Sequence, residues 1–214
     1  MMKNIVVLVS GNGSNLQEFI DACGNKIPNA RISAVISNKS DAYGLQRAIN
    51  ADIDVHSLSA AGYEGREQYD IALSTLIDLY QPDLIILAGF MRILSADFVL
   101  RYQGKMLNIH PSLLPKYTGL HTHQRAIDAG DEEHGTSVHF VTPELDGGPV
   151  ILQAKVPIFD EDTAEDVALR VQAQEHVIYP MVANWIIEER LIMTDGKAVL
   201  DGDALGTFGL ETEE

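Results

Sequence analysis

Three polar residues, Asn108, His110 and Asp146, are of types that can donate to a carbonyl oxygen, move a proton or hold a histidine in one tautomer. Asn108 and His110 lie two positions apart at the end of an apolar run, so both side chains would point to one side of an extended strand. An Asn amide can donate to a carbonyl oxygen, and a His can donate as imidazolium or move a proton. Asp146 lies in the turn Glu144–Pro149, where its carboxylate could hold the His110 tautomer. Taken alone, His110 could simply close a corner between strand and loop, and Asp146 could simply form a turn. The presence of all three residues at a strand end favours a functional site.

A second group of residues, the segment Ser10–Asn15, has the composition of an anion site. The segment stands between an apolar run and a helical pattern. Backbone N–H groups converge at such a turn and the helix dipole adds partial positive charge, with Gly13, Ser14 and Asn15 placed to supply the donors. The segment lacks the third glycine of the dinucleotide fingerprint and the Gly-Lys-Ser/Thr of a Walker A loop. From the motif alone, a phosphate site and a tight turn without a ligand both stay open.

Other chemistries lack a matching pattern. No Gly-x-Ser-x-Gly segment is present, which disfavours a serine hydrolase. Cys23 is the single cysteine and excludes both an intrachain disulfide and a metal site with several Cys ligands. Four histidines lie close in sequence without forming a His-x-x-x-His helix pair or a Cys–His set: His121, His123, His134 and His139. We therefore expect no metal, and we expect His121–His123 to open a helix.

The elements that must position these residues alternate between strand and helix. Apolar, β-branched runs predict buried strands at 5–9, 32–36, 53–56, 84–87 and 106–109. Helical spacing predicts helices at 16–23, 42–49 and 64–80, the first capped by Ser14 or Asn15. This order indicates an α/β fold, a doubly wound and mostly parallel sheet with helices on both faces and right-handed crossovers.

The character of the chain changes after Pro111. The alternation of 136–141 predicts a strand with one exposed face, and 150–158 a strand antiparallel to it. A long helix is expected over 163–189, where Thr163 and Asp166 resemble a capping box. Residues 191–200 predict a hairpin, and the acidic tail from Asp201 is expected to be frayed. We expect one domain over 1–214: a nucleotide-type half at about 1–100, a second half at about 101–200 and a tail at 201–214.

The charge and the hydrophobicity of the chain limit the kinds of partner that it can bind. The 214-residue chain has 15 Lys and Arg against 31 Asp and Glu, a net charge of −16. Such a surface repels nucleic-acid phosphate and anionic lipid, so an anionic substrate would need a local pocket. No apolar stretch approaches the ~20 residues of a membrane span, and the start is too short for a signal sequence. We expect a cytoplasmic protein that acts on small molecules, a monomer or homodimer without nucleic-acid or membrane partners.

Several long motifs occur together in the order of one enzyme family. The most specific stretches are 9–17, 87–94, 107–116 and 134–142, the last continuing through 146–151. From Ile5 to about Leu200 the chain resembles the phosphoribosylglycinamide formyltransferase family, folate-dependent enzymes of purine synthesis. One departure is visible, because Thr118 stands where the family usually has a proline.

The resemblance implies a fold, a reaction and a set of site residues. It implies a formyltransferase-like fold with a Rossmann-type N-terminal half and antiparallel C-terminal additions. It implies formyl transfer from 10-formyltetrahydrofolate, a co-substrate, to the amine of glycinamide ribonucleotide, with Asn108, His110 and Asp146 as the catalytic residues. The implied ribonucleotide-binding residues are Gly13, Ser14, Asn15, Gln172, Ala173, Gln174 and Glu175. The implied folate-binding residues are Arg66, Met91, Arg92, Ile93, Leu94, Asn108, Thr142, Pro143, Glu144, Leu145 and Asp146.

Three alternatives share parts of this pattern. A methionyl-tRNA formyltransferase would need a further C-terminal domain and a basic face for tRNA. A formyltetrahydrofolate hydrolase carries an N-terminal regulatory domain, for which a first strand at Ile5 would leave no room. A non-catalytic folate- or nucleotide-binding protein would be expected to lack one of Asn108, His110 and Asp146, and all three are present.

Overall fold

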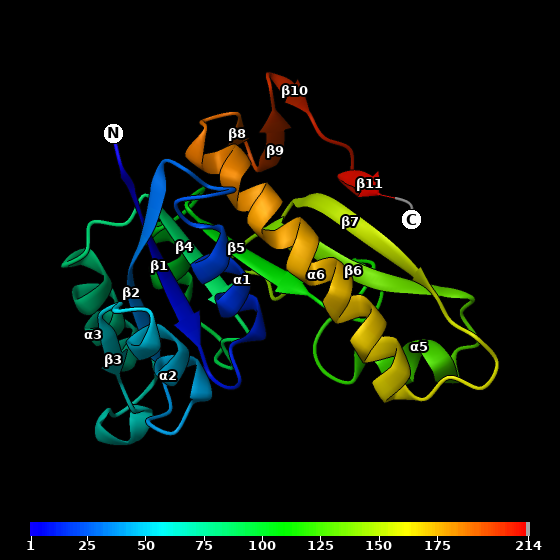
Figure 1. Ribbon diagram of the computed structural model, residues 1–214, viewed down its shortest axis with the longest axis horizontal. Helices are drawn as coiled ribbons and strands as arrows, with labels where there is room; N and C mark the ends of the chain where they lie inside the picture. Colours follow the sequence, from blue (N-terminus) through cyan, green and yellow to red (C-terminus); the bar gives the residue numbers. More distant parts are fainter. Residues whose placement is uncertain (213–214) are drawn as a thin grey trace.

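The centre of the molecule is a mixed, mostly parallel sheet. The computed structural model describes residues 1–212. Its eight strands run in the order β11-β7-β6-β5-β4-β1-β2-β3 (Figure 1). The parallel part consists of β1 (Lys3–Val9), β2 (Ala30–Ser37), β3 (Val55–Ser57), β4 (Leu84–Ala88) and β5 (Met106–His110). Two long strands, β6 (Glu133–Phe140) and β7 (Val150–Pro157), continue the sheet in antiparallel pairing, as the sequence predicts.

Helices cover both faces of the sheet. Their bounds are α1 (Ser14–Ala22), α2 (Tyr43–Asn50), η1 (Ala60–Gly62), α3 (Arg66–Asp78), α4 (Ala96–Arg101), α5 (Thr122–Asp128) and α6 (Ala164–Ile187). One apolar cluster joins α1, α2 and α6 to the sheet, and a second joins α3 and α4 to its other face. Alternate residues of β1 supply both clusters, Val7 and Val9 on one side and Val6 and Leu8 on the other. This explains why the strand is apolar without alternation.

Several element boundaries differ locally from the sequence expectation. The expectation that Ser14 or Asn15 caps α1 is wrong, because Gly13 is the N-cap residue and no side chain among residues 1–212 caps the helix start. The short helix α4 has no counterpart among the helices that the sequence predicts; it begins after Ser95, whose hydroxyl accepts from the Phe98 N–H. The capping box of α6 is confirmed, with Thr163 and Asp166 in reciprocal hydrogen bonds.

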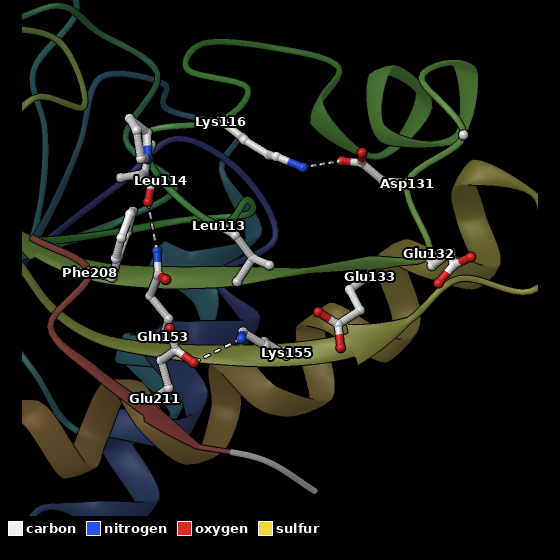
Figure 2. Close-up of a pocket in the computed structure, with 12 residues that line it drawn as sticks. Leu113, Leu114, Lys116, Asp131, Glu132, Glu133, Gln153, Lys155, Phe208 and Glu211 are labelled. Carbon is white, nitrogen blue, oxygen red and sulfur yellow. Dashed lines mark hydrogen bonds and ion pairs between the residues drawn. The ribbon is translucent and has the colours of Figure 1, made fainter.

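The expectation that β6 exposes one face is wrong. All of its residues after Glu133 are buried. The polar face of β6 is covered by the segment after β5: Ser137 Oγ donates to the Ser112 carbonyl at 2.6 Å and accepts from the Leu114 N–H at 3.0 Å. Gln153 of β7 donates to the Leu114 carbonyl at 2.9 Å (Figure 2). The alternation suggested that the polar residues of this face are exposed to water. They instead form hydrogen bonds to the loop that follows β5.

The tail is also more ordered than expected. The hairpin is confirmed as β8 (Leu191–Thr194) and β9 (Lys197–Leu200). The expectation that the chain frays from Asp201 is wrong for residues 201–212, because β10 (Asp203–Ala204) extends the hairpin and β11 (Leu210–Thr212) pairs with β7 (Figure 1). The rest of that expectation, residues 213–214, lies outside the described part of the chain. Within residues 1–212, no helix has the length and apolar character needed to cross a bilayer.

Candidate active site

His110 and Asp146 come together at the carboxyl end of β5. The His110 Nδ1 lies 3.5 Å from Asp146 Oδ2, with both side chains buried. The same carboxylate oxygen accepts from the Gly119 N–H at 2.9 Å, and Asp146 reaches this position with a left-handed φ of 52°. The His110 Nε2 lies 2.9 Å from the Tyr117 carbonyl oxygen. Both ring nitrogens thus face acceptors, so each N–H of an imidazolium would have a partner.

Asn108 points to the same side of β5 and is held by a fourth residue. Its Nδ2 lies 3.1 Å from Nε2 of His139, which sits opposite Asn108 in the β5–β6 pairing. The other ring nitrogen, Nδ1 of His139, lies 2.9 Å from the Phe140 carbonyl, which can only accept. Nδ1 therefore carries the proton, Nε2 accepts, and the Asn108 amide must present its NH₂ group to the ring. Burial lowers the pKa of His139, which keeps this ring neutral.

The glycine segment lies where β1 ends and α1 begins, and α6 closes over it. Gly13 turns the chain with φ 75°, and the first N–H groups of α1 follow it. Gln172 Nε2 donates to Ser14 Oγ at 3.0 Å, and Asn15 Nδ2 donates to Glu175 Oε2 at 2.9 Å. Asn15 Oδ1 is buried and lacks a hydrogen-bond partner within the described residues.

Glu175 and Thr136 connect the glycine segment to β5, the strand that carries Asn108 and His110. Burial raises the pKa of Glu175, and the hydrogen bonds from Asn15 and Thr136 act in the opposite direction. The Thr136 hydroxyl lies 3.3 Å from Glu175 Oε1 and 3.0 Å from the His110 carbonyl oxygen. A polar path therefore runs from Asn15 through Glu175 and Thr136 to the backbone of His110.

The segment after β4 lies against the end of β1 and against α3. The Met91 N–H donates to Ser10 Oγ at 2.8 Å. The Arg92 guanidinium stacks over the Tyr69 ring at 4.1 Å from its centroid, and Tyr69 lies one turn into the helix that Arg66 begins. Burial raises the pKa of Tyr69 to about 12. Large apolar side chains on this segment and on the turn before Asp146 are exposed: Met91, Ile93 and Leu145.

The family model described as formyl transferase matches residues 3–183. The chain belongs to the formyl transferase family. It is 59% identical over 211 residues to the phosphoribosylglycinamide formyltransferase of Escherichia coli K12, covering 99% of this chain and 100% of the relative. The enzyme of that name from Haemophilus influenzae is 52% identical over 212 residues, covering 99% and 100%. A solved phosphoribosylglycinamide formyltransferase from Coxiella burnetii, in complex with CHES, matches with a TM-score of 0.94 and 50% identity over 99% of both chains. The resemblance seen in the sequence is confirmed.

In this formyl transferase the residues named from the sequence do not all converge. Asn108, His110 and Asp146 lie together, and Gln172 and Glu175 of the α6 segment reach the glycine segment. Ala173 is exposed between them, on another face of the helix. Arg92 directs its guanidinium to Tyr69.

His139 is one of the residues near this site that the sequence interpretation missed, as is Thr136. The sequence named His139 only among four histidines with no metal pattern. The signal that identifies it is its position opposite Asn108 in antiparallel pairing. The other three histidines lie elsewhere: His121 is the N-cap of α5, and His123 and His134 contact each other with 3.1 Å between Nδ1 and Nε2. Within residues 1–212, no three His, Cys, Asp or Glu side chains form a potential metal site.

A cavity of about 560 Å³ lies beside the loop that follows β5 but shares none of these site residues. Its lining includes Leu113, Lys116, Gln153 and Phe208. Figure 2 shows Lys116 turned toward Asp131, to which it donates at 3.1 Å. The cavity therefore borders the outer side of the segment that carries Tyr117.

Proposed function

We propose that this chain transfers the formyl group of 10-formyltetrahydrofolate to the primary amine of glycinamide ribonucleotide. The observation that carries the proposal is the convergence of Asn108, His110 and Asp146 at a strand end, connected through Thr136 and Glu175 to a glycine segment at a helix start. One place suits an acyl group and the other a phosphate. Relatives called phosphoribosylglycinamide formyltransferase, which share half or more of their residues with this chain, support the same reaction.

On the ribonucleotide side, the N–H groups of Gly13, Ser14 and Asn15 bind the phosphate. No positive side chain is needed within the segment, because the amides and the helix dipole supply the donors. The stretch Gln172–Glu175 contacts the rest of this substrate, with Glu175 on the ribose hydroxyls. The buried, unpartnered Asn15 Oδ1 is available to a donor of the substrate.

On the folate side, Arg66, Met91–Leu94 and Thr142–Asp146 form the site, together with Asn108. Exposed Met91, Ile93 and Leu145 offer apolar surface for a flat ring, and backbone groups at the end of β4 offer polar contacts. The Arg92–Tyr69 stacking joins the Met91–Leu94 segment to α3, the helix that presents Arg66.

The proposed chemistry is direct acyl transfer without a covalent enzyme intermediate. The substrate amine attacks the formyl carbon, and negative charge develops on the formyl oxygen. Asn108 and protonated His110 donate to that oxygen. For this, the His110 Nε2–H exchanges its hydrogen bond with the Tyr117 carbonyl for one with the formyl oxygen. Asp146 holds the imidazolium, and the proton lost by the amine passes to the departing folate nitrogen through Asp146 and water. The bond from nitrogen to the formyl carbon forms on the amine and breaks on the folate.

The proposal extends to the organisation of the protein. Residues 1–214 form a single formyltransferase domain, in which the half at about 1–100 holds the phosphate and the half at about 101–200 carries the catalytic residues. A sheet that draws strands from both halves supports this organisation. The enzyme acts in the cytoplasm on small molecules, without metal, as a monomer or homodimer.

The test is a formyl-transfer assay on the purified full chain, followed optically through release of tetrahydrofolate. Each reaction contains 10-formyltetrahydrofolate, with glycinamide ribonucleotide or with no acceptor. We expect turnover only with the ribonucleotide. Equal turnover without acceptor would contradict the proposal and indicate the hydrolase. Tight folate binding with no turnover in either reaction would contradict it and indicate a binding protein.

A further inference from the structure

The helix α2 packs backbone to backbone against the glycine segment. The Gly44 N–H donates to the Gly11 carbonyl at 3.0 Å. A Cβ placed on Gly13 would lie only 2.8 Å from the Gly44 Cα, and Gly13 has a left-handed φ of 75°, so a side chain at position 13 would collide with the α2 backbone. The position of the glycine segment is therefore set by α2 as well as by α1.

Arg47, one turn into α2, donates from all three guanidinium nitrogens to the glycine segment and to the helix that follows it. Its Nε donates to the Asn12 carbonyl at 2.9 Å and one terminal nitrogen to Asn12 Oδ1 at 2.8 Å. The other terminal nitrogen donates to Gln17 Oε1 of α1 at 3.2 Å. The guanidinium also lies over the Tyr43 ring, 4.9 Å from its centroid. One side chain thus holds the residues on both sides of Gly13–Asn15.

The charge of Arg47 is not neutralised by any of these contacts. Its acceptors are a backbone carbonyl and two amide oxygens, and within residues 1–212 no carboxylate forms an ion pair with it. The molecule as a whole carries a net charge of −16, which opposes the approach of a phosphate. A positive charge held one residue from Gly13 offsets that field at the point where the anion would bind.

We propose that Arg47 is a positioning and specificity residue for the substrate phosphate. It fixes Asn12 and Gln17 so that the N–H groups between them converge, and its uncompensated charge favours a dianionic group at that place. This inference rests on the proposed function for its substrate. It predicts that Arg47 affects phosphorylated ligands and leaves the transfer step itself unchanged.

The test compares Arg47→Met and Arg47→Lys with a matched control, Arg31→Met. Arg31 is an exposed arginine that also donates to a neutral amide, Asn4 Oδ1 at 3.0 Å, away from the glycine segment. Ribose 5-phosphate is titrated into each protein by calorimetry, a readout that needs no turnover. Formyl transfer is then measured with glycinamide ribonucleotide and with its dephosphorylated riboside.

We expect Arg47→Met to weaken ribose 5-phosphate binding about three- to tenfold, the size of a screened charge interaction at a short distance. The KM for the ribonucleotide should rise by a similar factor with kcat nearly unchanged, while kcat/KM for the riboside stays at the wild-type value. Arg47→Lys, which keeps the charge without the planar fork, should lose less, and Arg31→Met should lose nothing.

Two results would overturn the inference. One is unchanged ribose 5-phosphate binding in Arg47→Met. The other is an equal loss for ribonucleotide and riboside, which would mean that Arg47 only maintains the fold. If Arg47→Met does not fold, Arg47→Lys takes its place. The loss of kcat/KM for the ribonucleotide is then compared with the loss for the riboside in that variant, and equal losses would overturn the inference. If the wild-type chain binds ribose 5-phosphate but transfers no formyl group, the proposed function fails while the calorimetry still tests Arg47.

Discussion

The Asn108 amide is oriented by a neutral, buried imidazole. His139 donates from Nδ1 to its own strand at the Phe140 carbonyl and accepts at Nε2 from Asn108. An amide rotated by half a turn would place its oxygen against an acceptor nitrogen, so only one orientation is stabilised. In that orientation the NH₂ group lies on the His139 side of the amide, held as a hydrogen-bond donor. His139 is therefore a positioning residue that acts through Asn108.

Replacing His139 by Phe tests this role. Phenylalanine keeps a flat aromatic ring, slightly larger than imidazole, but has no nitrogen to accept from Asn108, so we expect kcat to fall about tenfold or more while KM for the folate changes little. His139→Gln, whose amide oxygen can accept, should recover part of the loss. His56→Phe is the control, since His56 contacts Tyr80 at the far edge of the sheet. A His139→Phe enzyme with wild-type kcat would contradict the role.

The sequence identifies the candidate site residues more readily than the residues that hold them in place. Asn108 and His110 follow from spacing on a strand, and Gly13–Asn15 from a turn between strand and helix. His139 and Arg47 have no local pattern, because each acts on a residue that is distant in the chain, across a strand pair or between two helices. Their roles depend on tertiary packing that a single sequence does not display.

At the scale of elements, α5 and the start of β6 meet through two histidines. His134 of β6 and His123 of α5 are in contact, with ring centroids 5.2 Å apart. Burial, and then the neighbouring His123, lower the pKa of His134 to about 4, although Asp131 and the Pro111 backbone act in the opposite direction. The pKa of His123 is lowered too, again chiefly by burial. The lowered pKa values of both histidines favour neutral rings at this contact.

This contact predicts a stability change in acid. In the unfolded chain His134 binds a proton near its usual pKa of about 6.5, whereas in the folded protein it does so only near pH 4. The neutral His134 therefore contributes fully to the free energy of unfolding above pH 6.5, and this contribution is lost as the pH falls to 4. We expect a loss of about 2–3 kcal/mol in the free energy of unfolding over this window, measured by urea denaturation.

The matched variants are His134→Gln and His121→Asn. The first should flatten the pH dependence between 6.5 and 4. The second removes an exposed histidine at the α5 N-cap, where Asn tolerates the φ of 58°, and should leave the dependence intact. The same slope in His134→Gln as in the wild type would show that other groups carry the effect.

Apolar residues that recur every 3.6 positions predict helices, and those that alternate predict strands. These periodicities predict most of the elements, but they do not predict which other segments pack over each element. The parallel strands and the long helix α6 follow from their own residues. The burial of both faces of β6 does not, because it depends on a loop from 111–116 folding back onto Ser137 and Gln153. The strand β11 has no apolar alternation of its own and forms because β7 offers an open edge.

At the scale of the whole molecule, the two ends of the chain take different places in the sheet. The first strand, β1, lies between β4 and β2 inside the sheet, whereas β11 pairs with β7 and forms an edge strand. Lys155 of β7 and Glu211 form an ion pair at 2.8 Å, and Phe208 lines the cavity beside the loop 111–116. Up to Thr212, the tail therefore covers a sheet edge, and no hydrogen bond or ion pair of its described residues involves Asn108, His110 or Asp146.

Truncation after Leu200 tests this account of the tail. Loss of β10 and β11 leaves the β7 edge unpaired, so we expect a lower melting temperature and concentration-dependent aggregation, while kcat per folded molecule changes little. The full chain, measured at the same protein concentrations, is the control. A truncated protein with unchanged melting temperature, or one that is soluble but inactive, would contradict the account.

The most direct measurement of the central claim follows product formation by the full chain and by an Asn108→Ala, His110→Ala, Asp146→Ala variant. Both proteins receive 10-formyltetrahydrofolate and glycinamide ribonucleotide, and formylated ribonucleotide and released tetrahydrofolate are quantified together. We predict equal amounts of the two products from the full chain, and turnover at least about 10²-fold slower from the variant, with its ribonucleotide affinity preserved. A triple variant that keeps more than about a tenth of the wild-type turnover would contradict the claim that these residues carry the reaction.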